Sequence, residues 1–221
     1  MRRSRQTLRY LPLLFLGYVF FSSLLDSSFR LAELKIEGMA EGEVLQALLP
    51  FLGENLPQID ERRIKEALSS NPYIKAVGVK KLYPSSLIIE VEPRKPKALW
   101  VSSEGSLALL DEDGRPFGGP RNEKIEDLLL ISAPDEDRAR RLFEIVTRWV
   151  RQGLVRREDL MEVSFRDGEI TLFYGEDLAE IVLAERDLDE ALKRALCRYR
   201  DARRRGSILK RIDGRTGQTE G

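Results

Sequence analysis

An apolar run near the amino terminus constrains this chain more than any other feature of its sequence. Residues 8–25 read LRYLPLLFLGYVFFSSLL and carry no charge after Arg9. A helix of that length spans roughly 27 Å, close to the membrane hydrocarbon core of about 30 Å. Basic residues precede the run and Asp26 follows it. The positive-inside rule therefore predicts a cytoplasmic tail at residues 1–7, a single transmembrane helix at residues 8–25 and an exported remainder.

Two other interpretations of this run stay open. A cleaved signal peptide needs small residues at its cleavage site, and the serines within residues 22–28 could supply them. The bulky Leu24, Leu25 and Phe29 fit such a site poorly. A helix buried in a soluble core is disfavoured because the run is apolar on all its faces. The sequence therefore favours a retained anchor.

The inventory of side chains argues against an enzyme. The chain contains no His, and Cys197 is its one cysteine. This removes Ser-His and Cys-His dyads, an intrachain disulfide and the usual Cys- or His-based metal sites. Lys plus Arg and Asp plus Glu both number 37, so no overall charge attracts nucleic acid. We expect no catalytic residues, no cofactor, no metal, no nucleic acid and no small-molecule substrate.

The first exported segment switches between strand and helix periodicity. Residues 29–38 alternate between apolar and charged side chains and predict a half-buried strand. Residues 43–52 have apolar side chains at helical spacing, and Pro50 predicts that this helix kinks or ends near its last turn. A second helix is expected to begin after Asp60, a plausible N-cap, and to stop at Asn71, which precedes a proline.

Two further strands are predicted at residues 73–82 and 87–92, with a proline-containing turn between them. Glu90 and Glu92 resemble a carboxylate pair but alternate with apolar residues, which is typical of the solvated side of a sheet. The order strand, helix, helix, strand, strand predicts a compact α+β domain over residues 29–97.

Residues 98–213 predict a second α+β domain, in which a mixed sheet packs against helices. Residues 135–152 and 187–204 have apolar stripes at helical spacing. The polar, Gly-rich tail at residues 214–221 is expected to be disordered. The remaining apolar segments predict strands at residues 98–101, 107–111, 125–131, 160–165, 169–174, 178–183 and 208–212.

Several residues that could carry chemistry have simpler structural interpretations. Asp111 and Asp113 resemble part of a metal-binding loop but lack the run of ligands that such a loop needs, so we expect a turn with solvated acids. Trp100 and Trp149 lie in apolar settings and are expected in the core. Cys197 on the last helix is expected to be a small core residue.

A basic run ends the last predicted helix. It could contact anionic lipid or nucleic acid, but Tyr199 is its single interleaved aromatic residue. We expect a solvated helix end whose charges interact favourably with the helix dipole. The run consists of Arg198, Arg200, Arg203, Arg204 and Arg205.

Short motifs in both exported segments resemble a known family. Residues 71–76 (NPYIKA), the turn at residues 83–84 (YP) and residues 89–96 (IEVEPRKP) look like a POTRA domain. Residues 94–100 (RKPKALW) and 110–117 (LDEDGRPF) are similar to the FtsQ/DivIB pattern Glu-Arg-x-Pro-x-Ala-x-Trp followed by Asp-x-Asp-Gly. The resemblance runs from the apolar segment almost to the end of the chain. Two positions depart from that pattern: Pro93 separates the Glu from the Arg, and Lys97 replaces a small apolar residue.

The resemblance implies a POTRA domain, an FtsQ-type β domain and a non-catalytic role in septation. Such a protein is a single-pass scaffold of the cell inner membrane, with its bulk in the periplasm or extracytoplasmic space. It binds divisome proteins of the FtsB/DivIC and FtsL type. The expected means is addition of a partner strand to the terminal strand of the second sheet. The expected partner-binding residues are Tyr199, Ile208, Leu209, Lys210, Arg211, Ile212 and Asp213.

One position weakens that expected edge. FtsQ-like chains continue the strand with an apolar residue where this chain has Gly214. Two other functions stay open on the sequence: a POTRA-bearing factor for outer-membrane assembly or secretion, and an anchored cell-wall enzyme that relies on carboxylates.

Overall fold

The computed structural model of the chain describes residues 12–19, 22, 29–121, 125–214 and 219–220. Residues 12–19 are helical, but the predicted span at residues 8–25 lies partly outside the described residues. No helix within these ranges combines the length and the apolar character needed to cross a membrane. The chain divides into two compact units, residues 1–94 and 95–221. The predicted boundary lies three residues later, after Lys97.

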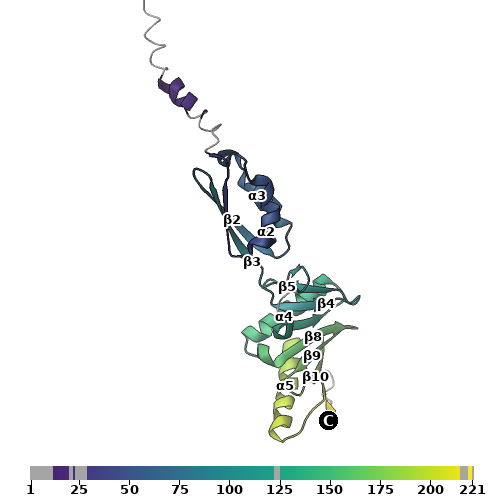
Figure 1. The fold of residues 1–221 in the computed structure, drawn as a ribbon. Helices are drawn as coiled ribbons and strands as arrows, with labels where there is room; N and C mark the ends of the chain where they lie inside the picture. The colour runs from purple at the N-terminus through teal and green to yellow at the C-terminus, as the bar shows by residue number, and fades with distance from the viewer. Residues whose placement is uncertain (1–11, 20–21, 23–28, 122–124, 215–218, 221) are drawn as a thin grey trace, which may run out of the picture. The chain divides into compact units, whose positions relative to one another are not determined.

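The first unit has the predicted order of elements, and its two α-helices lie beside a small sheet (Figure 1). The strand order is β1-β3-β2, with β1 parallel and β2 antiparallel to the central β3. Short 3-10 turns at residues 49–51 and 56–58 connect the helices. The bounds are β1 Glu33–Glu37, α2 Glu41–Leu48, α3 Glu61–Ser69, β2 Ile74–Leu82 and β3 Ser86–Pro93.

Local sequence signals explain where these helices begin and end. Pro50 lacks an amide hydrogen and cannot continue a helix, so α2 ends at Leu48 and tightens into the 3-10 turn. The Asp60 carboxylate accepts a hydrogen bond from the Arg62 amide at 2.9 Å, which confirms the predicted N-cap of α3. Asn71 follows the end of α3, and its side chain accepts from the Tyr73 amide at 3.0 Å.

One face of the small sheet forms the core of the first unit. Leu87, Ile89 and Val91 of β3 are buried under the helices. On the opposite face, Glu90 pairs with Lys80, and Glu92 lies 3.3 Å from Lys75. These pairs confirm that Glu90 and Glu92 belong to the solvated side of the sheet. Exposed pairs of this kind contribute about 0–1 kcal/mol each, so burial rather than charge holds the unit together.

Gly38 allows the chain to leave β1 close to β3. Its φ is +93°, and a Cβ at this position would lie 2.0 Å from the carbonyl oxygen of Val91. The residue must therefore be glycine both for its backbone conformation and for the close approach of another strand.

The second unit contains a mixed sheet that has nine strands among the described residues, in the order β12-β11-β10-β9-β8-β7-β4-β5-β6. Pairs β4–β7, β7–β8 and β10–β11 are parallel, and the others are antiparallel. The strands are β4 Ala98–Val101, β5 Leu107–Leu110, β6 Pro116–Phe117, β7 Leu129–Ser132, β8 Leu160–Arg166, β9 Glu169–Tyr174, β10 Ala179–Ala184, β11 Arg211–Asp213 and β12 Thr219–Glu220.

Two long helices, α4 Glu136–Arg151 and α5 Leu188–Arg204, pack on one face of this sheet (Figure 1). The Asp135 carboxylate caps α4 by accepting from the Arg138 amide at 2.8 Å. Trp149 of α4 is fully buried and donates its indole N–H to the Asp189 carboxylate of α5 at 2.7 Å. That hydrogen bond is the largest cause of a lowered pKa at Asp189. Trp149 is thus a core residue, as predicted.

Three details of the second unit differ from the sequence predictions. Residues 125–131 are not one strand, because a 3-10 turn at residues 125–127 precedes β7. Asp111 is buried rather than solvated, and its carboxylate accepts from the amides of Asp113 and Arg115 at 3.0 and 2.9 Å. Cys197 is exposed rather than in the core, because it lies on the outer side of α5.

The end of the chain also differs from the expectation of a disordered tail. Thr219–Glu220 form the short strand β12, which pairs with β11. Residues 215–218 and 221 lie outside the described residues.

The contact at Gly38 yields a testable prediction. Gly38→Ala is expected to lower the free energy of unfolding of the first unit by about 2–4 kcal/mol, because it adds both backbone strain and a clash with β3. The matched control is Gly42→Ala in α2, where a Cβ meets no atom within 4 Å. The control is expected to be neutral or to stabilise by up to about 1 kcal/mol. Urea denaturation of both variants measures the difference, and equal midpoints would contradict the prediction.

Candidate partner-binding site

The terminal strand β11 is shorter than predicted and begins at Arg211. Helix α5 ends at Arg204, and Gly206 follows it with φ +75°. Residues 207–210 then connect the helix to the sheet. Ile208 is 64 % exposed in this connection. Three of the six predicted edge residues, Ile208, Leu209 and Lys210, therefore lie outside the strand.

The backbone of β11 continues the sheet beyond β10. The Glu180 amide donates to the Lys210 carbonyl, and the Gly214 amide donates to the Val182 carbonyl, both at 2.9 Å. Ile212 is fully buried in the core of the unit, so its side chain is not available to a partner. What β11 offers a partner is main chain, together with the exposed Arg211 and the half-buried Asp213.

The outer edge of β11 is itself paired. Arg211 lies opposite Glu220, and Ile212 lies opposite Thr219, in antiparallel register with β12. The edge geometry is therefore compatible with an added antiparallel strand, because the chain's own end adds one. There is a steric reason for glycine at position 214. A Cβ at residue 214 would lie 2.7 Å from the Leu183 side chain and 3.1 Å from the Val182 carbonyl oxygen.

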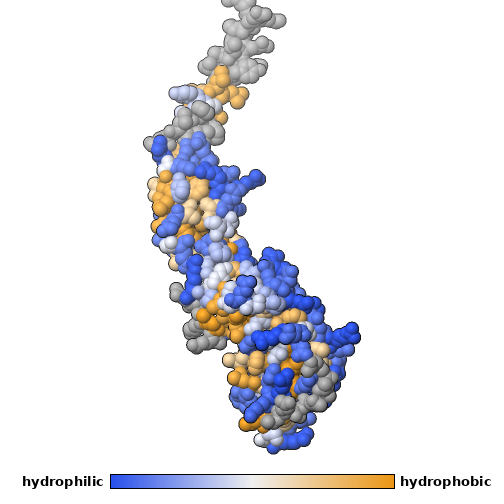
Figure 2. Space-filling model, turned by 90° about the vertical axis from the view of Figure 1, so that its right-hand side faces the viewer, coloured by the Kyte–Doolittle hydropathy of each residue, from blue (hydrophilic) through white to orange (hydrophobic). Residues whose placement is uncertain are grey.

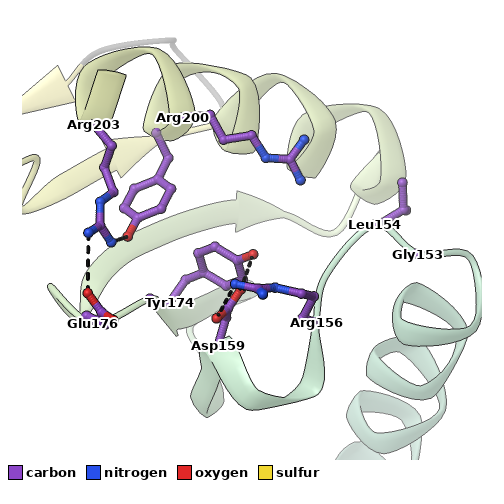
Figure 3. Close-up of a pocket in the computed structure, with 10 residues that line it drawn as sticks. Gly153, Leu154, Arg156, Asp159, Tyr174, Glu176, Arg200 and Arg203 are labelled. Carbon is purple, nitrogen blue, oxygen red and sulfur yellow. Dashed lines mark hydrogen bonds and ion pairs between the residues drawn. The ribbon is translucent and has the colours of Figure 1, made fainter. Parts of the chain in front are cut away.

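The Tyr199 side chain is buried in the wall of a cavity and is not exposed to solvent. It is 5 % exposed and packs edge-on against Tyr174, with ring centroids 5.5 Å apart. Its hydroxyl accepts from the Arg203 guanidinium at 3.3 Å (Figure 3). Gly175 has φ +74°, and a Cβ there would lie 2.1 Å from the Tyr199 hydroxyl oxygen. Tyr199 is thus a positioning residue for Arg203.

Arg203 lies between a tyrosine and the acids of the β9–β10 turn. Its guanidinium contacts Glu176 at 3.3 Å and Asp177 at 3.8 Å. The hydrogen bonds with Tyr199 and then Glu176 raise the pKa of Arg203, so its charge is fixed at any accessible pH. The sequence prediction placed Arg203 in a solvated helix end, whereas the structure ties its side chain to a neighbouring turn.

A second network forms the opposite wall of the cavity. The Tyr174 hydroxyl donates to the Asp159 carboxylate at 3.1 Å, and Arg156 binds the same carboxylate through two nitrogens at 2.9 and 3.0 Å (Figure 3). Burial, followed by the hydrogen bond to Asp159, raises the pKa of Tyr174 to about 12. Sequence reasoning missed this network because Arg156 and Asp159 lie in a connection with no periodicity.

The two networks and α5 line a cavity of about 520 Å³, whose charged residues are three arginines and two acids. Arg200 of α5 is exposed there, and no described carboxylate forms an ion pair with it. We call this cavity the arginine basin. Its lining residues are Gly153, Leu154, Arg156, Asp159, Tyr174, Gly175, Glu176, Tyr199, Arg200 and Arg203.

The charged side chains of the arginine basin are largely paired with one another. Among the described residues, no three carboxylate or Cys side chains gather closely enough to hold a metal ion. Each acid lining the arginine basin is already engaged by an arginine or a tyrosine. Arg200 therefore leaves an exposed positive charge at the end of the sheet where β9 turns into β10.

Comparison with known proteins identifies the first unit. Residues 29–94 match the family described as "POTRA domain, FtsQ-type". This range covers β1 to β3 and both α-helices of the first unit.

Proteins named cell division protein FtsQ resemble most of the chain. The one from Anaeromyxobacter sp. (strain K) is 24 % identical, over 87 % of this chain and 74 % of its own length. The one from Myxococcus fulvus is 25 % identical over 78 % of this chain and 64 % of its own length. The one from Bordetella pertussis is 28 % identical over 46 % of this chain and 39 % of its own length. The matches to the last two thus span less than two thirds of those relatives. Residues 29–94 are thus an FtsQ-type POTRA domain, and most of the chain is similar to cell-division proteins named FtsQ.

Proposed function

We propose that this chain is a non-catalytic scaffold that binds and recruits other division proteins at the septum. It is anchored in the inner membrane by one helix at residues 8–25, and its two folded units are exported. Its partners are proteins of the FtsB/DivIC and FtsL type. The FtsQ-type POTRA domain and the similarity to FtsQ proteins support the role in division, and the apolar run with its preceding arginines supports the anchor.

The observation that carries the proposal is the outer edge of β11. A strand edge with free amides and carbonyls is a template for another strand, and β12 occupies this edge through only two paired residues. An extended partner segment that displaces β12 forms a longer ladder along the same edge. Most of the affinity then comes from main-chain hydrogen bonds, and flanking side chains supply specificity.

The second part of the proposal is the charge of the arginine basin, which lies at the end of the sheet where β10 begins. Arg156 and Arg203 are neutralised by carboxylates of the chain, whereas Arg200 has no such partner among the described residues. A partner segment with an acidic side chain next to its added strand gains a charge-assisted contact here. Such contacts accelerate and orient association more than they raise its affinity.

The role of the β11 main chain can be tested at residue 213. The Glu180 and Gly214 amides donate hydrogen bonds between β10 and β11. Successive backbone amides of a strand point in opposite directions, so the Asp213 amide points to the outer side of β11. Asp213→Pro removes that donor and leaves Ile212 in the core. Loss of one hydrogen bond worth about 0.5–1.5 kcal/mol predicts roughly two- to tenfold weaker binding of an FtsB-type partner.

Asp213→Ala is the matched control, because it changes the side chain and keeps the amide. Titration of the purified full-length chain in detergent with the partner's extracytoplasmic segment measures both variants. Equal affinities for Asp213→Pro and the wild-type chain would refute strand addition at this edge. Circular dichroism verifies that both variants keep the fold.

The charge contribution is tested separately at Arg200. Arg200→Gln is expected to slow association with an acidic partner segment by about tenfold at low salt and by little at high salt, since solvent-exposed charges are screened. Arg194→Gln, an exposed arginine of α5 that does not line the basin, is the control. Stopped-flow association at two ionic strengths gives the rates. If Arg200→Gln and Arg194→Gln slow association equally, the basin has no specific role.

A further inference from the structure

One end of the POTRA unit carries exposed apolar side chains. Leu49 and Leu52, which follow α2, are 51 % and 42 % exposed, and Leu82 and Tyr83 at the β2–β3 turn are 50 % and 60 % exposed. Figure 2 shows apolar surface gathered on part of this unit rather than spread evenly. Single exposed apolar residues are ordinary, but a group of them marks a contact surface.

Backbone hydrogen bonds place these four residues at the same end of the unit. The Gly53 amide, next to Leu52, donates to the Leu31 carbonyl at 2.9 Å. The Ala32 amide donates to the Ser85 carbonyl of the β2–β3 turn, also at 2.9 Å. The loop after α2 and the β2–β3 turn are therefore both attached to the segment that enters the unit.

A ring contact and an ammonium contact reinforce this end. Phe29 lies edge-on to Tyr83, with ring centroids 6.3 Å apart. Lys81 donates from its ammonium group to the Ile59 carbonyl at 2.6 Å, which joins the start of α3 to the end of β2. We call the set Leu49, Leu52, Leu82 and Tyr83 the entry-end patch.

The chain length between Phe29 and the apolar run is short. Four peptide units separate Leu25, the last residue of the run, from Phe29. Fully extended, they reach at most roughly 14 Å. A lipid headgroup layer is itself about 5–8 Å thick. If residues 8–25 span the bilayer, the entry-end patch cannot lie far from the membrane surface.

We infer that the entry-end patch contacts the lipid surface and docks the POTRA unit on the bilayer. The inference depends on the proposed anchor at residues 8–25. Tyrosine and leucine are suited to the interface, where the apolar body enters the headgroup region and a polar tip stays hydrated. Two acids lie near this end: the Glu54 carboxylate is paired with Arg63 at 3.1 and 3.2 Å, and the Glu33 carboxylate accepts from the Ser86 hydroxyl at 2.9 Å. The adjacent Arg30 is exposed and places a cation beside lipid phosphates.

The test uses the full chain reconstituted into liposomes of phosphatidylethanolamine and phosphatidylglycerol. Cys197 is exposed, so Cys197→Ser first removes the native thiol. An environment-sensitive fluorophore is then attached at Leu82→Cys or Leu52→Cys. The control is Ser70→Cys, an exposed position at the carboxyl end of α3, the opposite end of the same unit. Lipids that carry a nitroxide on the headgroup quench a fluorophore that lies in the headgroup region.

Flotation of the liposomes is measured on the same samples and reports on the anchor. We expect the protein to float with the lipid, and the fluorophores at residues 82 and 52 to lose intensity while that at residue 70 keeps it. Protein that floats with equal quenching at all three positions, or with none, overturns the docking of this patch while the anchor stands. Protein that stays behind overturns the anchor and the docking together. A blue-shifted but unquenched fluorophore at residue 82 assigns the patch to a protein contact and also overturns the inference.

Discussion

The two helices of the second unit are joined by hydrogen bonds from α4 to one carboxylate of α5, that of Asp189. The Trp149 indole is fully enclosed, and its N–H reaches the Asp189 carboxylate at 2.7 Å. A buried donor without a partner costs roughly 1–3 kcal/mol, so this contact fixes both the rotamer of Trp149 and the start of α5. The start of α5 in turn determines where Tyr199, Arg200 and Arg203 lie ten or more residues later. The geometry of the arginine basin therefore follows from a contact in the core.

Both units are built in the same way. In each, helices cover one sheet face and provide the hydrophobic core, so the stability of the unit does not require its edges or its exposed ends. In the POTRA unit, this leaves the end where the chain enters free for contact with lipid. In the second unit, the core does not involve the outer edge of β11, which pairs with β12. The proposed scaffold role is consistent with this separation, because a partner could bind without disturbing the fold.

The sequence predicted the elements that rest on local signals. Asp60 and Asp135 mark helix starts because each caps a helix by a hydrogen bond within a few residues. Pro50 marks a helix end because it lacks an amide hydrogen. Cys197 was placed wrongly, since one turn of a helix separates buried from exposed positions and the stripe on α5 passes on either side of it. Periodicity alone therefore predicts the position of a helix better than it predicts the burial of each of its residues.

The parts that the sequence could not predict depend on distant contacts. Asp111 is buried because its carboxylate organises the turn before β6, which no alternation in the sequence indicates. The arginine basin brings together Asp159, Tyr174 and Arg203, which are far apart along the chain. Strand β11 is short because the chain needs residues 207–210 to return from α5 to the sheet. Tyr199 was predicted to bind a partner, but its side chain is buried and holds Arg203 in place.

The pairing of β12 with β11 has a consequence for selectivity. A segment that already occupies the edge acts as an internal competitor, so the affinity measured for any ligand is its intrinsic affinity reduced by the fraction of molecules whose edge is vacant. Short or poorly matched strands cannot overcome that competition, whereas a ligand with several paired residues can. The pairing with β12 also covers an edge that could otherwise pair with a second copy of the chain.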